Sequence, residues 1–494
     1  MNKIELTLSQ LEQYLSKAAW ILKGPVDASD YKAYIFPLLF FKRISDVYDE
    51  EYQNALEESG NDKEYAALKE FHRFEIPKDC HWKDIRETTV NVGSKIQNAF
   101  REIESSNQEY LYGIFGDVQW SNKEKLSDEL LTNLIEHFSQ YNLSNSMVSA
   151  DILGQAYEYL IKHFADLTNK KAGEFYTPRS VIHLMTLILD PKENESIYDP
   201  ACGTGGMLIE CLEYLKKSNQ DSRTLKVYGQ ESNLTTSAIA RINLFLHDAE
   251  DFNIFKGDTL RNPGFFDKDA LKKFDCVIAN PPFSLDNWGV EGWVNDRFGR
   301  NSTGVPPNKN GDMAWVQHMI KSMNNKGRMA IILPSGALTR VGKERNIRRV
   351  LLEQDMVEAV ISLGPNIFYG TQLAPYILIL KNKKEEYKKN KVFFIDASDE
   401  IRVGRAQSHL EQENVKKIFA WYSKNENIDN YTKVVSIEEI KENEYSLNIP
   451  LYVEKIMEDN LPSMEDALSD LKSVWNESLD TDRKFKNLLK EFIS

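Results

Sequence analysis

The sequence predicts an α/β fold in which a mostly parallel sheet is covered by helices on both faces. After about residue 151, short apolar runs alternate with longer stretches of helical periodicity. Strands that are apolar along their whole length are typical of a parallel sheet buried on both faces. The expected strands are Ser196–Tyr198, Lys226–Gly229, Asn253–Lys256, Phe274–Ala279, Arg328–Leu333, Val357–Ser362 and Ala374–Leu380, with a further run at Lys391–Ile395.

Helical periodicity fills most of the intervals between these strands. The stretch before Phe274 is rich in turn residues and could hold a short helix near Asp267–Lys273. Only a short link with glycine and proline separates the sixth strand from the seventh, so this pair is expected to run antiparallel. The remaining expected helices are Met207–Lys216, Leu234–Leu246, Met313–Met323 and Lys343–Leu352.

Helical regions flank the predicted sheet in the sequence. Apolar residues recur at helical spacing before residue 150, notably in Leu6–Ala19 and Tyr31–Tyr48. The tail Met464–Ile493 is a polar helix with a narrow apolar stripe, which suits docking on another helix in this chain or in a partner. We expect an all-helical N-terminal domain at 1–150, an α/β domain at 151–455 and a C-terminal helical tail at 456–494.

Composition excludes several classes of protein. The net charge is −14, whereas a protein that binds nucleic acid without a partner usually has a basic surface. DNA chemistry would therefore need a local basic cleft or a partner that supplies phosphate contacts.

No apolar run is long enough to cross a membrane, and the polar Met1–Gln10 lacks the layout of a signal peptide. The four cysteines lack CxxC spacing, so no disulfide framework or metal site is indicated, and the cytoplasm is the expected location.

A glycine-rich stretch, here called the glycine loop, follows the first strand and begins a helix. It consists of Asp199, Pro200, Ala201, Cys202, Gly203, Thr204, Gly205 and Gly206. Its glycines allow close approach of a ligand, although such a turn can also be purely structural. No Lys-Ser/Thr pair follows, which excludes a P-loop, and Leu208 stands where a dinucleotide fingerprint needs glycine. Asp199 would repel a pyrophosphate and attract an ammonium group, which points to a cofactor with a methionine end.

Two more acidic residues follow the next two strands. Glu231 can accept hydrogen bonds from both hydroxyls of a ribose, and Asp258 can accept one from the amino group of adenine. Either residue alone could be an ordinary solvated carboxylate. Acids at three successive strand ends indicate instead the ligand crevice of an open α/β sheet.

The fourth strand is followed by a rigid turn, here called the proline turn, which consists of Asn280, Pro281, Pro282 and Phe283. An amine conjugated to a ring is a poor nucleophile because its lone pair is delocalised. The Asn280 side-chain oxygen and the Pro281 carbonyl can each accept one N–H, which pulls the nitrogen toward tetrahedral geometry. The prolines hold the turn rigid, and Phe283 offers a face on which an extruded base can stack. The turn therefore predicts methylation of an amino nitrogen.

Together these elements resemble those of N6-adenine DNA methyltransferases, and the whole chain resembles the modification subunits of Type I restriction–modification systems. A further element of that family lies just before the first strand, at 173–179. The resemblance implies a Rossmann-like class I methyltransferase sheet, S-adenosyl-L-methionine as cofactor, and a catalytic role for the proline turn. It also implies a set of cofactor-binding residues: Glu174, Phe175, Tyr176, Thr177, Pro178, Arg179, Asp199, Gly203, Thr204, Gly205, Gly206, Glu231 and Asp258.

The resemblance also implies methylation of N6 of adenine in double-stranded DNA, which protects host DNA from restriction. In the family, two copies of the modification subunit work on one specificity subunit that reads the DNA site, and a restriction subunit can join them. The tail Met464–Ile493 is then the candidate for docking on the specificity subunit. A methyltransferase of protein glutamine, an RNA N6-adenine methyltransferase and a catalytically silent scaffold stay open as alternatives, although the intact acids and Asn280 argue against the scaffold.

The segment Ser284–Gly311, here called the connecting segment, is long for a loop and contains five glycines, two tryptophans and three basic residues. We expect it to be mobile without DNA and to fold over a flipped adenine, with a plain surface insertion as the alternative. Asp312 is expected to cap the following helix rather than to position the target. His247 and His318 are expected to be structural.

Overall fold

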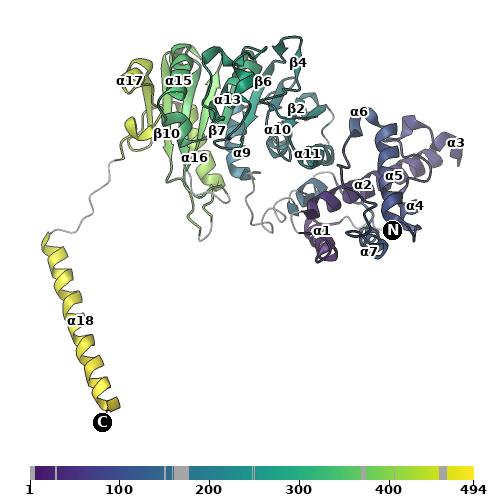
Figure 1. The fold of residues 1–494 in the computed structure, drawn as a ribbon, viewed down its shortest axis with the longest axis horizontal. Coiled ribbons are helices and arrows are strands. Elements are labelled where there is room, and N and C mark those ends of the chain that lie inside the picture. The colour runs from purple at the N-terminus through teal and green to yellow at the C-terminus, as the bar shows by residue number, and fades with distance from the viewer. Residues whose placement is uncertain are drawn as a thin grey trace. The chain divides into compact units, whose positions relative to one another are not determined.

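A nine-stranded sheet organises the computed structural model, with its strands in the order β11-β10-β8-β9-β7-β6-β1-β2-β3 (Figure 1). The structure describes residues 6–27, 30–149, 152–157, 159–160, 177–247, 249, 251–368, 374–404, 407–455 and 464–493. The strands of this sheet are β1 Ser196–Asp199, β2 Lys226–Glu231, β3 Phe252–Lys256, β6 Phe274–Ala279, β7 Met323–Pro334, β8 Val357–Leu363, β9 Pro375–Lys381, β10 Lys391–Ala397 and β11 Thr432–Ser436.

Five neighbouring strands, β7, β6, β1, β2 and β3, are joined by parallel pairing. β1 pairs in parallel with β2 and β6, β2 with β3, and β6 with β7. β9 lies between β7 and β8 and runs antiparallel to both, which confirms the antiparallel pair expected for the sixth and seventh strands. β10 is parallel to β8, and β11 pairs antiparallel with β10 at the edge. The predicted α/β class with a mostly parallel sheet is therefore confirmed.

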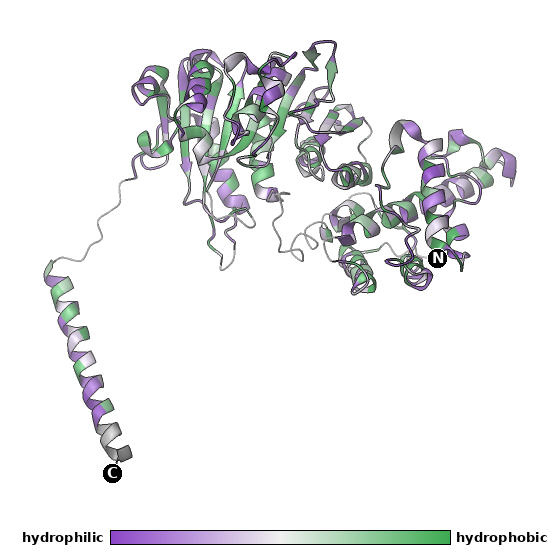
Figure 2. Ribbon diagram, viewed as in Figure 1, coloured by the Kyte–Doolittle hydropathy of each residue, from purple (hydrophilic) through white to green (hydrophobic). Residues whose placement is uncertain are grey.

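Helices cover both faces of the sheet, because its strands direct apolar side chains both ways. In β7, Ala330 and Ile332 belong to one core, whereas Met329, Ile331 and Leu333 belong to the other. Figure 2 shows hydrophobic residues along these central strands. The first core is covered by α9 Arg179–Leu189, α10 Gly206–Lys217 and α16 Gln412–Lys424. The second core is covered by α13 Asp312–Ser322, α14 Ser335–Thr339, α15 Lys343–Glu353 and α17 Ile437–Glu442.

Every regular element described before α9 is a helix, as the sequence predicts for the N-terminal region. α2 continues ten residues beyond the expected end at Tyr48, and its buried apolar residues belong to a third core. The elements are α1 Leu8–Leu22, α2 Tyr31–Glu58, α3 Lys63–Ala66, η2 Lys69–Phe71, α4 Trp82–Arg86, α5 Val92–Ser106, α6 Gln108–Leu111 and α7 Asp128–Phe138.

Helix α11, Leu234–Leu246, joins this helical region to the sheet. Its Ala240 and Leu244 belong to a sheet core, whereas Ile239, Ile242, Phe245 and Leu246 belong to the core of the N-terminal helices. Every residue from 236 to 246 is buried, which explains why this helix lacks a polar face.

Two short elements differ from expectation. The stretch near Asp267–Lys273 is a hairpin, β4 Phe266–Asp267 against β5 Ala270–Leu271, and the short helix suggested there is wrong. Lys268 has a φ of 53°, a left-handed conformation that tight hairpin turns use and α-helices exclude. β11 is not among the expected strands, because its run TKVVS is short and follows a polar region.

The chain divides into two compact units, Met1–Val453 and Glu454–Ser494. The helical region and the sheet belong to the same unit, so a domain boundary near residue 150 stays a prediction. In the second unit the structure describes one helix, α18 Met464–Ile493, and the side chains of its apolar stripe are exposed from Leu468 to Phe485. Among the described residues, no helix has the length and apolar character needed to cross a membrane.

Phe245→Ala should lower the free energy of unfolding of the first unit by about 3 kcal/mol, because it leaves a cavity between α11 and α2. Phe245 is 8% exposed, and its ring centroid lies 5.3 Å from that of Phe40. Urea-induced unfolding, followed by circular dichroism and by tryptophan fluorescence, measures the change. Val90→Ala, at a position that is 66% exposed, should change the same quantity by less than about 0.5 kcal/mol. Equally small changes for both variants would contradict the packing of α11 described above.

Candidate active site

Four polar side chains lie along one edge of the sheet. Because β1, β2, β3 and β6 are parallel neighbours, their carboxyl ends share that edge. Asp199 is the last residue of β1 and Glu231 the last of β2, while Asp258 follows β3 closely and Asn280 follows β6 directly. The topology thus brings together the three acids and the proline turn that the sequence singles out.

The glycine loop turns at this edge with a backbone that suits glycine. Gly203 and Gly205 have φ angles of 52° and 83°, in the left-handed region. The Gly203 N–H donates to Glu231 Oε2 at 3.1 Å, and Asn243 Nδ2 donates to the Thr204 carbonyl at 3.0 Å. A Cβ at Gly203 would meet no heavy atom within 4 Å, so the loop faces open space there. Gly206 then begins α10, whose first N–H groups have no partner within the helix.

Asp199 is a buried carboxyl group beside this loop, only 2% exposed. Its Oδ1 accepts a hydrogen bond from the Ala201 N–H at 2.9 Å. Burial raises the pKa of Asp199 to about 8, with a smaller contribution from the negative charge of Glu231 and against the effect of the Ala201 hydrogen bond. A cation placed against this carboxylate would favour its charged form.

In both Glu231 and Asp258, one carboxylate oxygen accepts hydrogen bonds from backbone N–H groups of the turn that follows. Glu231 Oε1 accepts from the Asn233 N–H at 2.8 Å. Asp258 Oδ1 accepts from the N–H groups of Leu260 and Arg261 at 3.0 and 3.1 Å, and its Oδ2 lies 3.3 Å from Arg261 Nε. The Asp258 side chain is 44% exposed, so its Oδ2 has room for a further donor.

Asn280 has a fixed side chain and one unused acceptor. Its Nδ2 donates to Thr177 Oγ1 at 2.8 Å. Its Oδ1 is buried and has no hydrogen-bond partner among the described residues. A buried amide oxygen without a hydrogen-bond donor lowers the stability of the folded state by roughly 1–3 kcal/mol. Such an unpaired acceptor marks a position where an N–H of a ligand would fit.

The rest of the proline turn is packed on the neighbouring core. Pro281 is buried, and Phe283 is half-buried with its ring centroid 6.3 Å from that of Phe368. Of the element at 173–179, Thr177 contacts Asn280, Pro178 precedes α9 and Arg179 is the first residue of that helix. Glu174, Phe175 and Tyr176 lie outside the described residues.

The connecting segment is anchored by its two tryptophans. Trp288 and Trp293 are each 1% exposed, and their Nε1 atoms donate to the Pro307 carbonyl at 2.8 Å and to Gln317 Oε1 at 3.1 Å. The segment also forms α12 Val290–Trp293 and η4 Arg300–Thr303, neither of which the sequence predicts. These contacts argue against mobility of the whole segment, because two buried indoles would have to leave their core.

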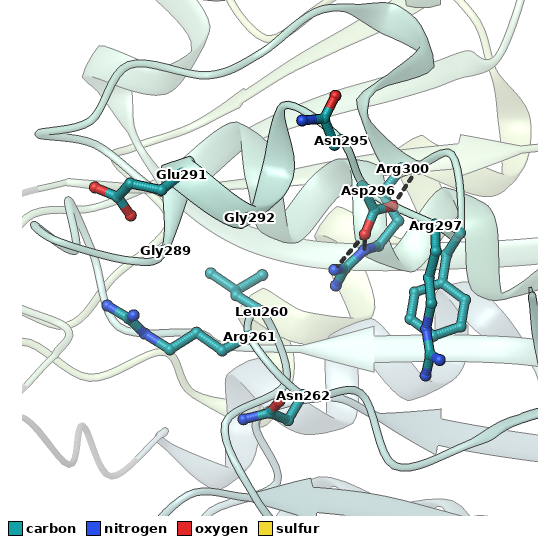
Figure 3. Close-up of a pocket in the computed structure, with 11 residues that line it drawn as sticks. Leu260, Arg261, Asn262, Gly289, Glu291, Gly292, Asn295, Asp296, Arg297 and Arg300 are labelled. Atoms are coloured by element: carbon teal, nitrogen blue, oxygen red, sulfur yellow. Dashed lines mark hydrogen bonds and ion pairs between the residues drawn. The ribbon is translucent and has the colours of Figure 1, made fainter.

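A pocket of about 560 Å³ lies between the loop after β3 and the connecting segment (Figure 3). Asp296 and Arg300 pair at 2.7 Å in its wall, with side chains 3% and 4% exposed, so their charges compensate each other. Arg297 lies over the ring of Phe298, 4.5 Å from its centroid. Asp199, Glu231 and Asn280 do not line this pocket, so it is distinct from the edge that they share.

Asp312 does not cap α13, and the capping expectation is wrong. Gly311 is the N-cap, and Asp312 is the first helical residue. Its Oδ1 accepts from the Ser284 N–H at 2.7 Å, and its Oδ2 lies 3.2 Å from Arg340 Nη1. Sequence reasoning missed Arg340 altogether, because a lone arginine 28 residues away carries no local signal for this contact.

The two histidines are buried and hydrogen-bonded within the fold, as expected for structural residues. His247 Nδ1 lies 2.9 Å from the Asn243 carbonyl, and His318 Nε2 lies 3.1 Å from the Tyr198 hydroxyl. Burial lowers the pKa of both imidazoles, and the charge of Arg300 adds to the effect at His318.

A Rossmann-like sheet with a glycine loop, strand-end acids and a proline turn on one edge is the architecture of a methyltransferase, and comparison with known proteins agrees. The N-6 DNA methylase family model matches residues 148–460, and the HsdM N-terminal domain model matches residues 11–138. The chain is 35% identical to the Type I restriction enzyme MjaVIII methylase subunit of Methanocaldococcus jannaschii, over 99% of this chain and 86% of that relative.

Two further similarities span most of the chain. The Type I restriction enzyme MpnII methylase subunit of Mycoplasma pneumoniae is 28% identical over 94% of both chains. The crystal structure of a type I restriction-modification methyltransferase subunit from Streptococcus thermophilus matches with a TM-score of 0.78 and 30% identity, over 91% of this chain and 100% of that one. The chain therefore belongs to the N-6 DNA methylase family, as an adenine-specific DNA methyltransferase of the Type I methylase-subunit kind.

Asp199→Asn should stabilise the ligand-free chain relative to the wild type, and increasingly so as the pH rises from about 4 to about 8. The folded pKa of Asp199 is about 8, whereas an unfolded Asp has a pKa of about 3.9. Between these values the folded state binds more protons, so the contribution of Asp199 to stability falls with rising pH and levels off above about 8. Asn keeps an acceptor for the Ala201 N–H and does not titrate.

Thermal unfolding midpoints of both proteins between about pH 5 and 8.5 measure this difference. Asp221→Asn serves as the control, because that side chain is 41% exposed and the pKa of its carboxyl is lowered by the Arg223 guanidinium. Its difference from the wild type should stay flat over the same range. A flat difference for Asp199→Asn as well would contradict the raised pKa of the buried carboxyl.

Proposed function

We propose that this chain transfers the methyl group of S-adenosyl-L-methionine to N6 of adenine in double-stranded DNA, at a site read by a partner specificity subunit, and so protects host DNA from restriction. The observation that carries the proposal is the buried Asn280 Oδ1, an acceptor without a donor on the edge where Asp199 and Glu231 also end their strands. The methylase subunits to which the chain is similar support adenine in DNA as the target over protein glutamine or RNA.

In this proposal the proline turn holds the target amine. Asn280 Oδ1 accepts one N–H while Nδ2 stays bound to Thr177, and the Pro281 carbonyl accepts the second N–H. Two acceptors pull the nitrogen toward tetrahedral geometry, so that its lone pair is localised and forms the new N–C bond. The methylated nitrogen then releases a proton to solvent. Phe283, which packs against Phe368, stacks on the extruded base.

The glycine loop and the strand-end acids have the chemistry that S-adenosyl-L-methionine requires. The buried Asp199 would face the ammonium group, Glu231 the ribose hydroxyls and Asp258 the adenine amino group. The open space at Gly203 supports close approach of the ligand to the backbone of Gly203, Thr204, Gly205 and Gly206. When bound, the cofactor supplies a methyl group on a sulfonium, which becomes a neutral thioether after transfer. We assign Thr177, Pro178 and Arg179, together with Glu174, Phe175 and Tyr176, to its methionine part.

Asn280→Ala should abolish DNA methylation, because it removes the acceptor that prepares the amine. The test is co-expression of the full chain with its specificity subunit in a host free of adenine methylation, followed by mapping of modified adenines. The wild type should mark one split motif, and Asn280→Ala none, while its complex still assembles and binds S-adenosyl-L-methionine. Asn54→Ala, at an exposed asparagine of α2, should methylate like the wild type. Persistent methylation in Asn280→Ala would overturn the mechanism.

We further propose that two copies of this chain assemble with one specificity subunit, that a restriction subunit can join them, and that α18 docks on the specificity subunit. The net charge of −14 supports a complex in which the specificity subunit supplies part of the DNA contacts, since an acidic chain repels phosphates. Leu468, Leu471 and Trp475 form an exposed apolar stripe on α18, which supports docking of this helix on a partner.

Trp475→Asp should weaken copurification of the chain with its specificity subunit by at least about tenfold, because a carboxylate would be buried in an apolar contact. Trp475 is 65% exposed in the chain alone, so the substitution leaves its own fold intact. Ser473→Asp introduces the same charge away from the apolar stripe and should assemble normally. Equal assembly of both variants, measured by pull-down and light scattering, would rule out α18 as the docking helix.

A further inference from the structure

The chain that leaves the proline turn is pinned by a buried carboxylate. Ser284, which follows Phe283, has a φ of 50°, a left-handed conformation that costs a non-glycine residue roughly 1–2 kcal/mol. Its N–H donates to Asp312 Oδ1 at 2.7 Å. The next carbonyl, that of Leu285, accepts from the Gly311 N–H at 3.0 Å. These two hydrogen bonds close the connecting segment at its base, directly behind the proline turn.

Arg340 completes this anchor from the other side. Its Nη1 lies 3.2 Å from Asp312 Oδ2 and 2.9 Å from Glu344 Oε1, and its Nη2 lies 3.4 Å from Ser284 Oγ. Asp312 and Glu344 are each 1% exposed, and this guanidinium compensates the charge of both carboxylates, with Arg348 contributing at Glu344. Asp312 and Arg340 therefore act on the same residue, Ser284, one through its backbone and the other through its side chain.

The surrounding backbone accommodates the guanidinium. A Cβ at Gly336 would lie 2.5 Å from Arg340 Nη2, so a larger residue there would displace the guanidinium from this position. The Arg340 N–H donates to the Gly336 carbonyl at 2.9 Å, and the Arg340 carbonyl accepts from Arg348 Nη2 at 2.8 Å. Asp312 begins α13, which lies between β6 and β7 in the chain, and Arg340 follows α14, the helix after β7. Because β6 and β7 are parallel neighbours, the anchor ties together the carboxyl ends of both strands.

We propose that Asp312 and Arg340 are positioning residues for methyl transfer, which hold the backbone of the proline turn so that Asn280 Oδ1 and the Pro281 carbonyl meet the target amine at the correct angle. This inference rests on the proposed function. Neither side chain needs to touch the substrate, since both act through Ser284. Displacing reacting groups by about 1 Å can lower a rate about 100-fold, so the loss should appear in the chemical step and not in binding.

The test compares single-turnover methylation of cognate DNA by the full chain in its complex with the specificity subunit. Asp312→Ala and Arg340→Ala should each lower the single-turnover rate by about 30- to 100-fold, with the Kd for S-adenosyl-L-methionine unchanged within about twofold. Asp312→Asn keeps an acceptor for the Ser284 N–H and loses the charge, so its rate should lie between those of Asp312→Ala and the wild type. The double variant should be no slower than about the slower single variant, because the two residues act as one unit.

Arg345→Ala is the matched control, since it removes an arginine from α15 that pairs with Glu444 at 3.0 Å on the surface. Its rate should equal that of the wild type. The molar ratio of bound S-adenosyl-L-methionine to protein counts the folded molecules, so a rate that falls only in proportion to this ratio would overturn the positioning role. Wild-type rates in both alanine variants, or effects that multiply in the double variant, would overturn it as well. Absence of adenine methylation by the wild-type complex would instead refute the proposed function.

Discussion

The parallel pairing of β1 with β2 and with β6 is the constraint on which the rest of the structure depends. It sends the chain out of each strand at the same edge, so that Asp199, Glu231 and Asn280 lie there although they are far apart in the sequence. Antiparallel pairing of β6 would have moved Asn280 to the opposite edge. The covered faces of the sheet, the helices that connect its strands and the polar edge all follow from this arrangement.

The sheet and its polar edge could be predicted because their signals are local. Each central strand is a short and mainly apolar run, and Asp199, Glu231 and Asn280 each stand at the end of such a run or directly after it. The hairpin at β4 and β5 could not be predicted, because its conformation depends on a left-handed Lys268, and lysine carries no turn signal of its own.

The features of the site that could not be predicted from the sequence depend on contacts between distant segments. Asp312 looks like a helix cap from its position, yet its carboxylate turns back to Ser284 and Arg340, which are each 28 residues away. The glycines of the connecting segment suggest mobility, yet Trp288 and Trp293 are buried against residues that a local pattern does not identify. Burial decides both outcomes, and it is set by the tertiary structure.

Helix α11 belongs to two cores at once, and this has a thermodynamic consequence. On one side, Ala240 packs near Gly205 and Asn243 holds the Thr204 carbonyl, while on the other side Phe245 packs into the N-terminal helices. Loosening of those helices would free α11 and with it the backbone of the glycine loop. A ligand that binds the loop only while α11 is in place would by linkage also protect the N-terminal helices from local unfolding, although it need not touch them.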